Sequence, residues 1–290
     1  MKYVVWFTLL GLALSLGCGG GGGAVSTSTQ KVTLAYKQLG GASSQYKMTS
    51  SVTLNSMGNT NSWVSDVAFT ARVESISTDG VITRRITFDD FSIFEQSGGK
   101  LEPDNLAPGY KGQYLWMQQA ADGKVLHWNG LDGIRSYTAE DRDLKNVLVQ
   151  QMATAYQPLP TEAVGVGSKW QGTLEIPVTI RGGEFTQKIT VDYEVVGFGQ
   201  RGSRNCVKIQ TRTATEGKGT GNRAEDRQFW VNTTGSGKGF IWFDYDNGLI
   251  VEYETNVTAD QELKYERTAK TDIATEASTV DSQTKIKLVK

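Results

Sequence analysis

The feature that most constrains the fold of this chain is an apolar–polar alternation with a period of two. In its clearest run the apolar positions are Trp63, Val67, Phe69, Ala71 and Val73, and Asp66, Thr70, Arg72 and Glu74 stand at positions between them. Successive side chains of a β-strand point to opposite faces. The pattern therefore predicts a mainly β fold, built from antiparallel strands with one buried face and one wet face.

Three hairpins follow from the alternation and from the turns that interrupt it. Asp79-Gly80 separates the first run from a return strand at 82–88, and Asn247-Gly248 separates the two halves of 240–257, both being tight-turn dipeptides. A glycine-rich turn at 197–202 joins 189–195 to 207–209 in the third hairpin. Shorter strands are expected at 32–36, 46–54, 114–118, 125–128, 170–176 and 229–231.

Glycine-rich and small polar stretches are expected to lie outside the regular strands. Residues 217–221 and 235–239 are predicted to be flexible loops, because glycine is depleted in strands. Residues 268–284, rich in Thr, Ser and Ala, are predicted to be loose. Residues 286–288 would then form an edge strand, whose lysine discourages pairing with other chains.

One segment, residues 138–156, breaks the period of two. It begins with Thr138 and acidic residues, which are favoured at a helix N-terminus, and Pro158 follows its end. Its apolar residues recur at three- and four-residue steps: Leu144, Val147, Leu148, Met152 and Ala155. Such a stripe must be buried. The sequence therefore predicts a strongly curved, half-barrel-like antiparallel sheet with this one main amphipathic helix against it.

The N-terminus resembles the signal of a bacterial lipoprotein. Lys2 precedes an apolar run from Val4 to Leu16, then Gly17, Cys18 and five glycines follow, which is the layout of an export signal. The interpretation is a signal peptide at 1–17, a lipidated Cys18 with a Gly/Ser-rich tether at 18–30, and a single β-rich domain at 31–290. The alternative is a simple secretory signal cut near Ala24-Val25-Ser26, which would leave a soluble protein.

Lipidation of Cys18 predicts where in the cell the protein is located. A membrane-spanning anchor is not expected, because the apolar run is shorter than the roughly 20 residues that a helical span needs. Two or more acyl chains give stable anchoring. By the resemblance to sorted lipoproteins, Gly19 after the cysteine favours the outer membrane, so we expect an outer-membrane lipoprotein of the cell envelope that faces the periplasm or the outside.

Composition argues against several classes of function. Lys and Arg number 30 against 31 Asp and Glu, for a net charge of −1, and this balance does not favour nucleic acid. Once Cys18 is lipidated, Cys206 has no disulfide partner and is expected to be buried and structural. His127 is the only histidine, so a histidine-based metal site or nucleophile has little support.

The remaining motifs lack residues or arrangements that the corresponding chemistry requires. The Gly237-Lys238 pair lacks the upstream glycine of a phosphate loop, because Asn232 stands there. Asp89 and Asp90 are adjacent on a predicted strand, so they are expected on opposite faces rather than facing each other. Asp244 and Asp246 lie at a turn without a dense oxygen set. No catalytic residue, metal ligand or cofactor is assigned, and the protein is not expected to be an enzyme.

The aromatic residues leave two interpretations open. Five tryptophans fall on predicted strands: Trp116, Trp128, Trp170, Trp230 and Trp242. They could pack a core, or they could line an apolar ligand cavity between helix and sheet, because such pockets are mostly hydrophobic and aromatic.

The layout as a whole resembles the half-barrel lipoproteins and lipid carriers of the bacterial envelope, of the LolA/LolB and mycobacterial lipoprotein-carrier type. It resembles still more a domain-of-unknown-function class of bacterial lipoproteins. The resemblance is carried by Leu159-Pro160, Val164 to Trp170, Gly237 to Phe240 and Asp244 to Gly248.

The resemblance implies non-enzymatic binding or carriage of an apolar or lipid ligand. The alternative is an envelope scaffold or protein-interaction module with no small ligand. The expected partners are the membrane through the N-terminal lipid, an apolar small molecule or lipid, and envelope proteins, without nucleic acid.

Overall fold

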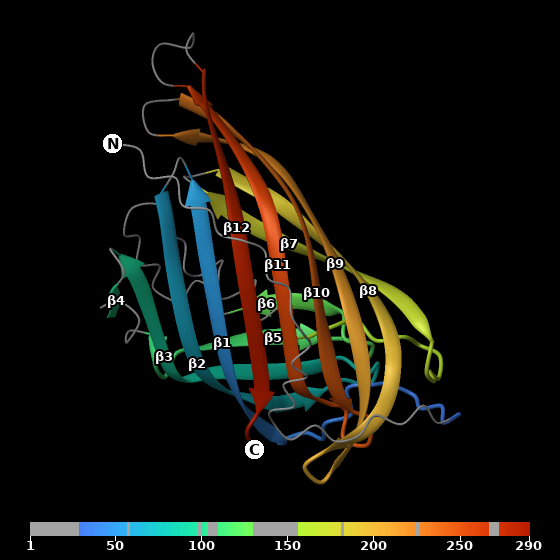
Figure 1. Ribbon diagram of the computed structural model, residues 1–290. Helices are drawn as coiled ribbons and strands as arrows, with labels where there is room; N and C mark the ends of the chain where they lie inside the picture. Colours follow the sequence, from blue (N-terminus) through green and yellow to red (C-terminus); the bar gives the residue numbers. More distant parts are fainter. Residues whose placement is uncertain are drawn as a thin grey trace, which may run out of the picture.

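β-Strands form nearly all of the regular structure in the computed structural model, which describes residues 29–56, 59–97, 100–103, 110–129, 156–180, 183–223, 227–266 and 273–290 (Figure 1). The described residues form twelve strands: β1 (Ser43–Ser56), β2 (Asn59–Ile76), β3 (Ile82–Ser97), β4 (Lys100–Pro103), β5 (Tyr114–Gln119), β6 (Val125–Asn129), β7 (Lys169–Ile180), β8 (Gly183–Arg201), β9 (Arg204–Arg223), β10 (Arg227–Asp244), β11 (Leu249–Glu266) and β12 (Ile273–Leu288).

The strands pair into one antiparallel sheet. Its order is β6-β5-β3-β2-β1-β12-β11-β10-β9-β8-β7, and β4 pairs with β3 beside this path. The first and last strands are neighbours, in a register that runs from Tyr46 opposite Leu288 to Ser56 opposite Ser278. This pairing makes one continuous sheet of the strands before residue 130 and those after residue 155. The path is open, with β6 and β7 at its two ends.

The hydrophobic core lies on one face of the sheet, which we call the inner face. A row of buried, cross-strand paired residues runs over this face through β1, β12, β11, β10, β9 and β8: Met48, Ile286, Tyr253, Ile241, Ile209 and Val195. Figure 1 shows the sheet curving so that β5 and β6 cross behind the long strands, and Leu115 and Met117 of β5 belong to the same core. Each such side chain contributes about 1.5–3 kcal/mol by burial.

Connecting segments close the core at the C-terminal end of β12. Val32 forms a backbone bridge with Val164, and the Tyr36 amide donates to Ala121 O at 3.2 Å. Gly248 has a φ of +67°, and a Cβ there would collide with backbone atoms of Ala35 and Lys37. Only glycine allows both this backbone conformation and this close approach. The segment from residue 29 to 42 is thereby held against the turn between β10 and β11.

The three predicted hairpins are confirmed. β2 and β3 pair around Asp79-Gly80, β8 and β9 around Gly202, and β10 and β11 around Gly248. All three glycines have positive φ angles, of 82°, 61° and 67°. The two turn dipeptides located their reversals correctly, whereas residues 197–201 of the predicted glycine-rich turn belong to β8 and the chain reverses only at Gly202.

The predicted fold class is wrong about the main amphipathic helix that was expected to pack against the sheet. Every regular element of the described residues is a strand, and no described helix is long and apolar enough to cross a membrane. The helix predicted at 138–156 lies outside the described residues except for Tyr156. In the described part, the inner face packs against other strands of its own curved sheet and against extended segments, with Tyr36 and Leu159 in the core. A helix is therefore not needed to bury it.

Three predictions about irregular stretches are also wrong. Residues 217–221 lie within β9 and residues 235–239 within β10, where both are paired. Residues 273–284 belong to β12 rather than to a loose tail, and β12 lies between β1 and β11 instead of at an edge. Glycine and small polar residues favour loops by their intrinsic preference, but pairing with strands on both sides supplies the hydrogen bonds that hold these stretches in the sheet.

Candidate functional site

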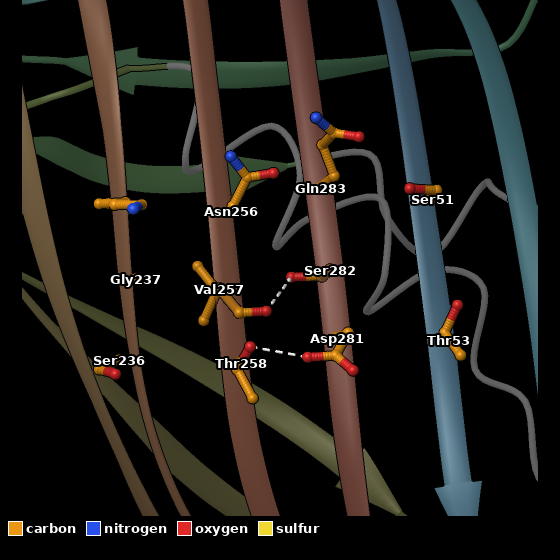
Figure 2. A pocket seen from close by; sticks show the side chains of 11 residues that line it. Ser51, Thr53, Ser236, Gly237, Asn256, Val257, Thr258, Asp281, Ser282 and Gln283 are labelled. Atoms are coloured by element: carbon orange, nitrogen blue, oxygen red, sulfur yellow. Dashed lines mark hydrogen bonds between the residues drawn. The ribbon is translucent and has the colours of Figure 1, made fainter. Parts of the chain in front are cut away.

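A polar groove crosses the outer face of four interior strands, β10, β11, β12 and β1 (Figure 2). It has a volume of about 460 Å³ and is lined by Ser51, Thr53, Ser236, Gly237, Lys238, Asn256, Val257, Thr258, Asp281, Ser282 and Gln283. Thr258 Oγ1 donates to Asp281 Oδ1 at 2.7 Å, and Ser282 Oγ donates to the Val257 carbonyl at 3.5 Å. The strands here are paired on both sides, so this outer groove offers side chains but no free backbone.

A second groove lies beside β7, one of the two ends of the sheet. This edge groove has a volume of about 420 Å³ and is lined by Lys169, Trp170, Gln171, Asp192, Tyr193, Glu194, Gln210 and Arg212. Lys169 Nζ lies 3.4 Å from Glu194 Oε2, and Gln171 Nε2 donates to Asp192 Oδ1 at 2.8 Å. Charges of both signs therefore line a groove that reaches the edge of the sheet.

Trp170 fixes the position of β7 at this groove. Its ring stacks on Tyr193 with centroids 5.0 Å apart and an interplanar angle of 9°, and its Nε1 donates to the Pro158 carbonyl at 3.0 Å. Across the inner face, Gly172 leaves room for Pro158, whose Cγ would lie 2.7 Å from a Cβ at that position. The beginning of β7 is thus anchored to the core, while no described strand pairs with its side away from β8.

Alternate residues of β7 direct their backbone N–H and C=O groups away from the sheet. Gly167, with a φ of +84°, donates to Val195 O, and the Val195 amide donates to Ser168 O, which is the pattern of a glycine bulge. From Trp170 opposite Tyr193 onward, every second residue bonds β8. The residues between them point their N–H and C=O groups away from the sheet: Lys169, Gln171, Thr173 and Glu175.

Apart from Trp170 and Tyr193 at the edge groove, the aromatic residues of the described core pack against other side chains. The enclosed cavity at Arg84 and Tyr46 measures about 10 Å³. Trp242 is 1% exposed and lies under Arg201, whose guanidinium carbon is 3.7 Å from the ring centroid. Trp128 and Trp170 pack against the core. For Trp242 and Trp128 the packing interpretation fits better than a cavity lining, whereas Trp170 both packs against the core and lines the edge groove.

Buried tyrosines bring hydroxyl groups into the core. Tyr36 exchanges hydrogen bonds of 3.1 Å with the backbone of Gln157, and Tyr193 OH donates to Gln157 Oε1 at 2.5 Å. Burial raises the pKa of Tyr36, Tyr46, Tyr156 and Tyr193 above the usual range, and that of Tyr253 to about 12. These hydroxyls stay neutral at physiological pH and act as hydrogen-bonding groups rather than as bases.

The residues considered from the sequence are spread over the molecule. Cys18 lies outside the described residues. Cys206 is buried as predicted, and burial, followed by the nearby Asp244 charge, raises the pKa of its thiol to about 12. His127 is exposed on β6.

The two aspartates of β3 are both exposed, so the prediction that Asp89 and Asp90 face opposite sides is wrong. A register shift between Ala68 and Phe69 places an extra residue in β3. Phe88 and Phe91, which flank the pair, are both buried. A bulge changes the alternation of faces by one residue, and sequence periodicity does not reveal it.

Asp244 serves the turn between β10 and β11. It is fully buried and accepts hydrogen bonds from Arg204 Nη1 and Asn247 Nδ2, each at 2.8 Å, and from two backbone amides. Burial acts to raise its pKa, but these donors hold the pKa below the usual range. Within the described ranges, no group of three or more His, Cys, Asp or Glu residues could hold a metal ion.

Sequence reasoning missed the buried polar cluster of Arg84, Gln38 and Gln119. All three side chains are buried. A signal was present, because Arg84 shares its face of β3 with Ile82, Ile86 and Phe88 and therefore falls on the apolar side of the alternation. A charged residue on an apolar face marks a buried charge.

Comparisons with known proteins add little. No protein family and no curated protein matches the chain. Among solved structures, the crystal structure of Pseudomonas aeruginosa OccK11 (OpdR) aligns over 88% of this chain and 99% of that protein, with 8% sequence identity and a TM-score of 0.21. At this TM-score the likeness carries no argument about fold or function.

Proposed function

We propose that the protein is a non-enzymatic interaction module of the cell envelope, tethered to the outer membrane through Cys18. Its site is the β7 edge with the edge groove, and its partner is a protein that adds an extended segment to the sheet. A Gly/Ser-rich sequence of the length of the predicted tether spans about 20 Å in root-mean-square terms.

The observation that carries this proposal is the length and openness of β7. β7 has 12 residues, whereas the opposite end of the sheet, β6, has 5. An exposed edge offers unpaired N–H and C=O groups to an incoming strand, and such strand addition is a recurring mode of peptide binding. Backbone hydrogen bonds would supply affinity, and neighbouring side chains would supply specificity.

The edge groove has the chemistry for such a partner. Lys169 and Arg212 supply positive charge, and Asp192 and Glu194 supply negative charge. Charges of both signs at the rim of an interface affect binding specificity and the association rate more than they affect affinity. Pro177 lies near the end of β7 and has no N–H to donate, so we expect the added strand to pair with the part of β7 before it.

Carriage of an apolar or lipid ligand is less well supported. Ligand pockets measure roughly 300–1,000 Å³ and are mostly apolar, whereas the enclosed cavity of the described core measures about 10 Å³. The larger outer groove is lined mainly by hydroxyl, amide and charged side chains. Native mass spectrometry that found a non-covalent, lipid-sized mass on the protein would revive this function.

Photo-crosslinking in intact cells tests the proposal. A photoreactive amino acid replaces Thr173, which is exposed on the edge strand β7, or Thr234, which is exposed on the interior strand β10. We expect a discrete protein adduct from position 173 and none from position 234. No adduct at 173, or the same adducts at both positions, would contradict the proposed site.

A further inference from the structure

The edge strand β7 carries opposite charges at equal distances from a central glycine. Lys169 lies three residues before Gly172, and Glu175 lies three residues after it. Gln171 and Thr173 flank the glycine. These four side chains are exposed on the outer face, and their backbone N–H and C=O groups point away from β8. This stretch of β7 is therefore chemically complementary to itself when it is read in reverse.

A second copy of β7, placed antiparallel about Gly172, would meet these groups in register. Lys169 would lie opposite the partner's Glu175, and Gln171 would lie opposite the partner's Thr173. Each of these pairs joins two residues whose backbone groups point outward. In an antiparallel ladder, two such residues exchange both of their N–H···O bonds. The register that pairs the charges is thus also one that pairs the backbone.

The ends of this register fall where neither strand has a backbone donor to offer. Pro177 would lie opposite the partner's Gly167. Proline has no N–H, and the Gly167 N–H already donates to Val195 O at 2.8 Å. The pairing can therefore stop at both ends without leaving an N–H group unpaired.

The charges of the outer face would continue across the junction between the two copies. Within one chain, Lys169 lies opposite Glu194, with 3.4 Å between Nζ and Oε2, and Glu175 lies opposite Lys188. Joining two copies would place Glu194, Lys169, the partner's Glu175 and the partner's Lys188 in one row of alternating charge. Opposite charges on facing strands are favourable, and like charges are unfavourable. A register shifted by two residues would remove the contact between Lys169 and the partner's Glu175.

The inner face of the same pairing brings apolar side chains together. Trp170 would lie opposite the partner's Leu174. Trp170 is half-buried and lines the edge groove, so part of its ring remains open to a neighbour. Side chains directly opposite each other have Cβ atoms about 4.5–5.5 Å apart, which permits contact. At the centre, Gly172 would face the partner's Gly172 without a side chain between them.

We propose that a second copy of this chain occupies the β7 edge, and that antiparallel β7–β7 pairing about Gly172 joins the two sheets into one. This inference rests on the proposed function, because it names the partner that adds a strand to the sheet. Both copies use the same edge, so the contact is self-complementary and the assembly closes at two chains.

Charge reversal followed by mixing tests the dimer. Sedimentation of the full chain in detergent measures the dissociation constant of the dimer. In Lys169→Glu two carboxylates would face each other at both ends of the junction, and in Glu175→Lys two ammonium groups would. We expect each variant alone to raise the dissociation constant about tenfold. An equimolar mixture of the two variants should regain the natural value, because the mixed dimer pairs opposite charges at both ends.

Lys285→Glu is the matched control. Lys285 forms an ion pair of 3.1 Å with Glu254 on interior strands of the same face, so its reversal is expected to leave the dimer unchanged. Urea unfolding checks that all variants are folded. A natural protein that stays monomeric, or a mixture no more dimeric than its components, would overturn the second copy as the partner.

Photo-crosslinking from position 173 separates this inference from the proposed function. An adduct with twice the mass of the chain supports the second copy. An adduct with a different protein would overturn the self-pairing but leave strand addition at β7 in place. No adduct, together with a monomer in sedimentation, would contradict both.

Discussion

Hydrogen bonds offset the energetic cost of burying individual charged side chains in this protein. Asp244 has no exposed surface, yet four donors surround its carboxylate. Arg84 shows the contrasting case, with two neutral acceptors and one unused donor. Hydrogen bonds to charged groups are worth about 1.5–3 kcal/mol each. The turn after β10 therefore depends on its carboxylate remaining ionised.

Asp244→Asn tests this dependence through pH. The pKa of Asp244 is lower in the folded protein than in the unfolded chain, so the unfolded state binds more protons in acid and the contribution of Asp244 is lost as pH falls. We expect the variant to lose about 2 kcal/mol of unfolding free energy at pH 7. The difference from the natural protein should shrink below about pH 4. Urea unfolding at several pH values measures it, and a difference that stays constant would contradict the account.

At the scale of the elements, the alternation and the turn dipeptides located the hairpins, because side-chain period and glycine conformations are local properties. The loop prediction for the glycine-rich stretches of β9 and β10 is wrong because their structure depends on neighbouring strands. A Cβ at Gly235 would lie 2.7 Å from Cβ of Ala259, and one at Gly239 would lie 2.9 Å from Cα of Thr255. Glycine therefore permits a close approach of β10 to β11, which the sequence of one strand does not reveal.

Gly239→Ala distinguishes a packed strand from a flexible loop. The added Cβ would collide with the Glu254 carbonyl and approach Thr211 Oγ1 at 3.0 Å, so β11 would have to move. Overpacking of this kind costs about 1–3 kcal/mol. Ser236→Ala, on the exposed outer face of the same strand, is the control and should change stability by less than about 0.5 kcal/mol. Equal stability of the two variants in urea would support the loop interpretation instead.

At the scale of the whole molecule, the defining feature is the pairing of β1 with β12, which places β6 and β7 at the ends of the sheet. Periodicity assigns faces to strands but not partners, so the sequence could not predict this order. The candidate site depends on it directly. Trp170 belongs to the strand predicted at 170–176 and Lys169 lies just before it, but only the topology of the described strands makes this strand an edge with outward-facing backbone groups.

Blocking the backbone of β7 tests strand addition most directly. A photoreactive amino acid at Gln210, which lines the edge groove, is combined with Thr173→Pro or Thr173→Ala. Proline removes an outward-facing N–H and is tolerated at edges, whereas alanine changes only the side chain. We predict that the adduct from position 210 disappears with proline and persists with alanine, while both proteins remain folded. An adduct unchanged by proline would contradict binding through the β7 edge.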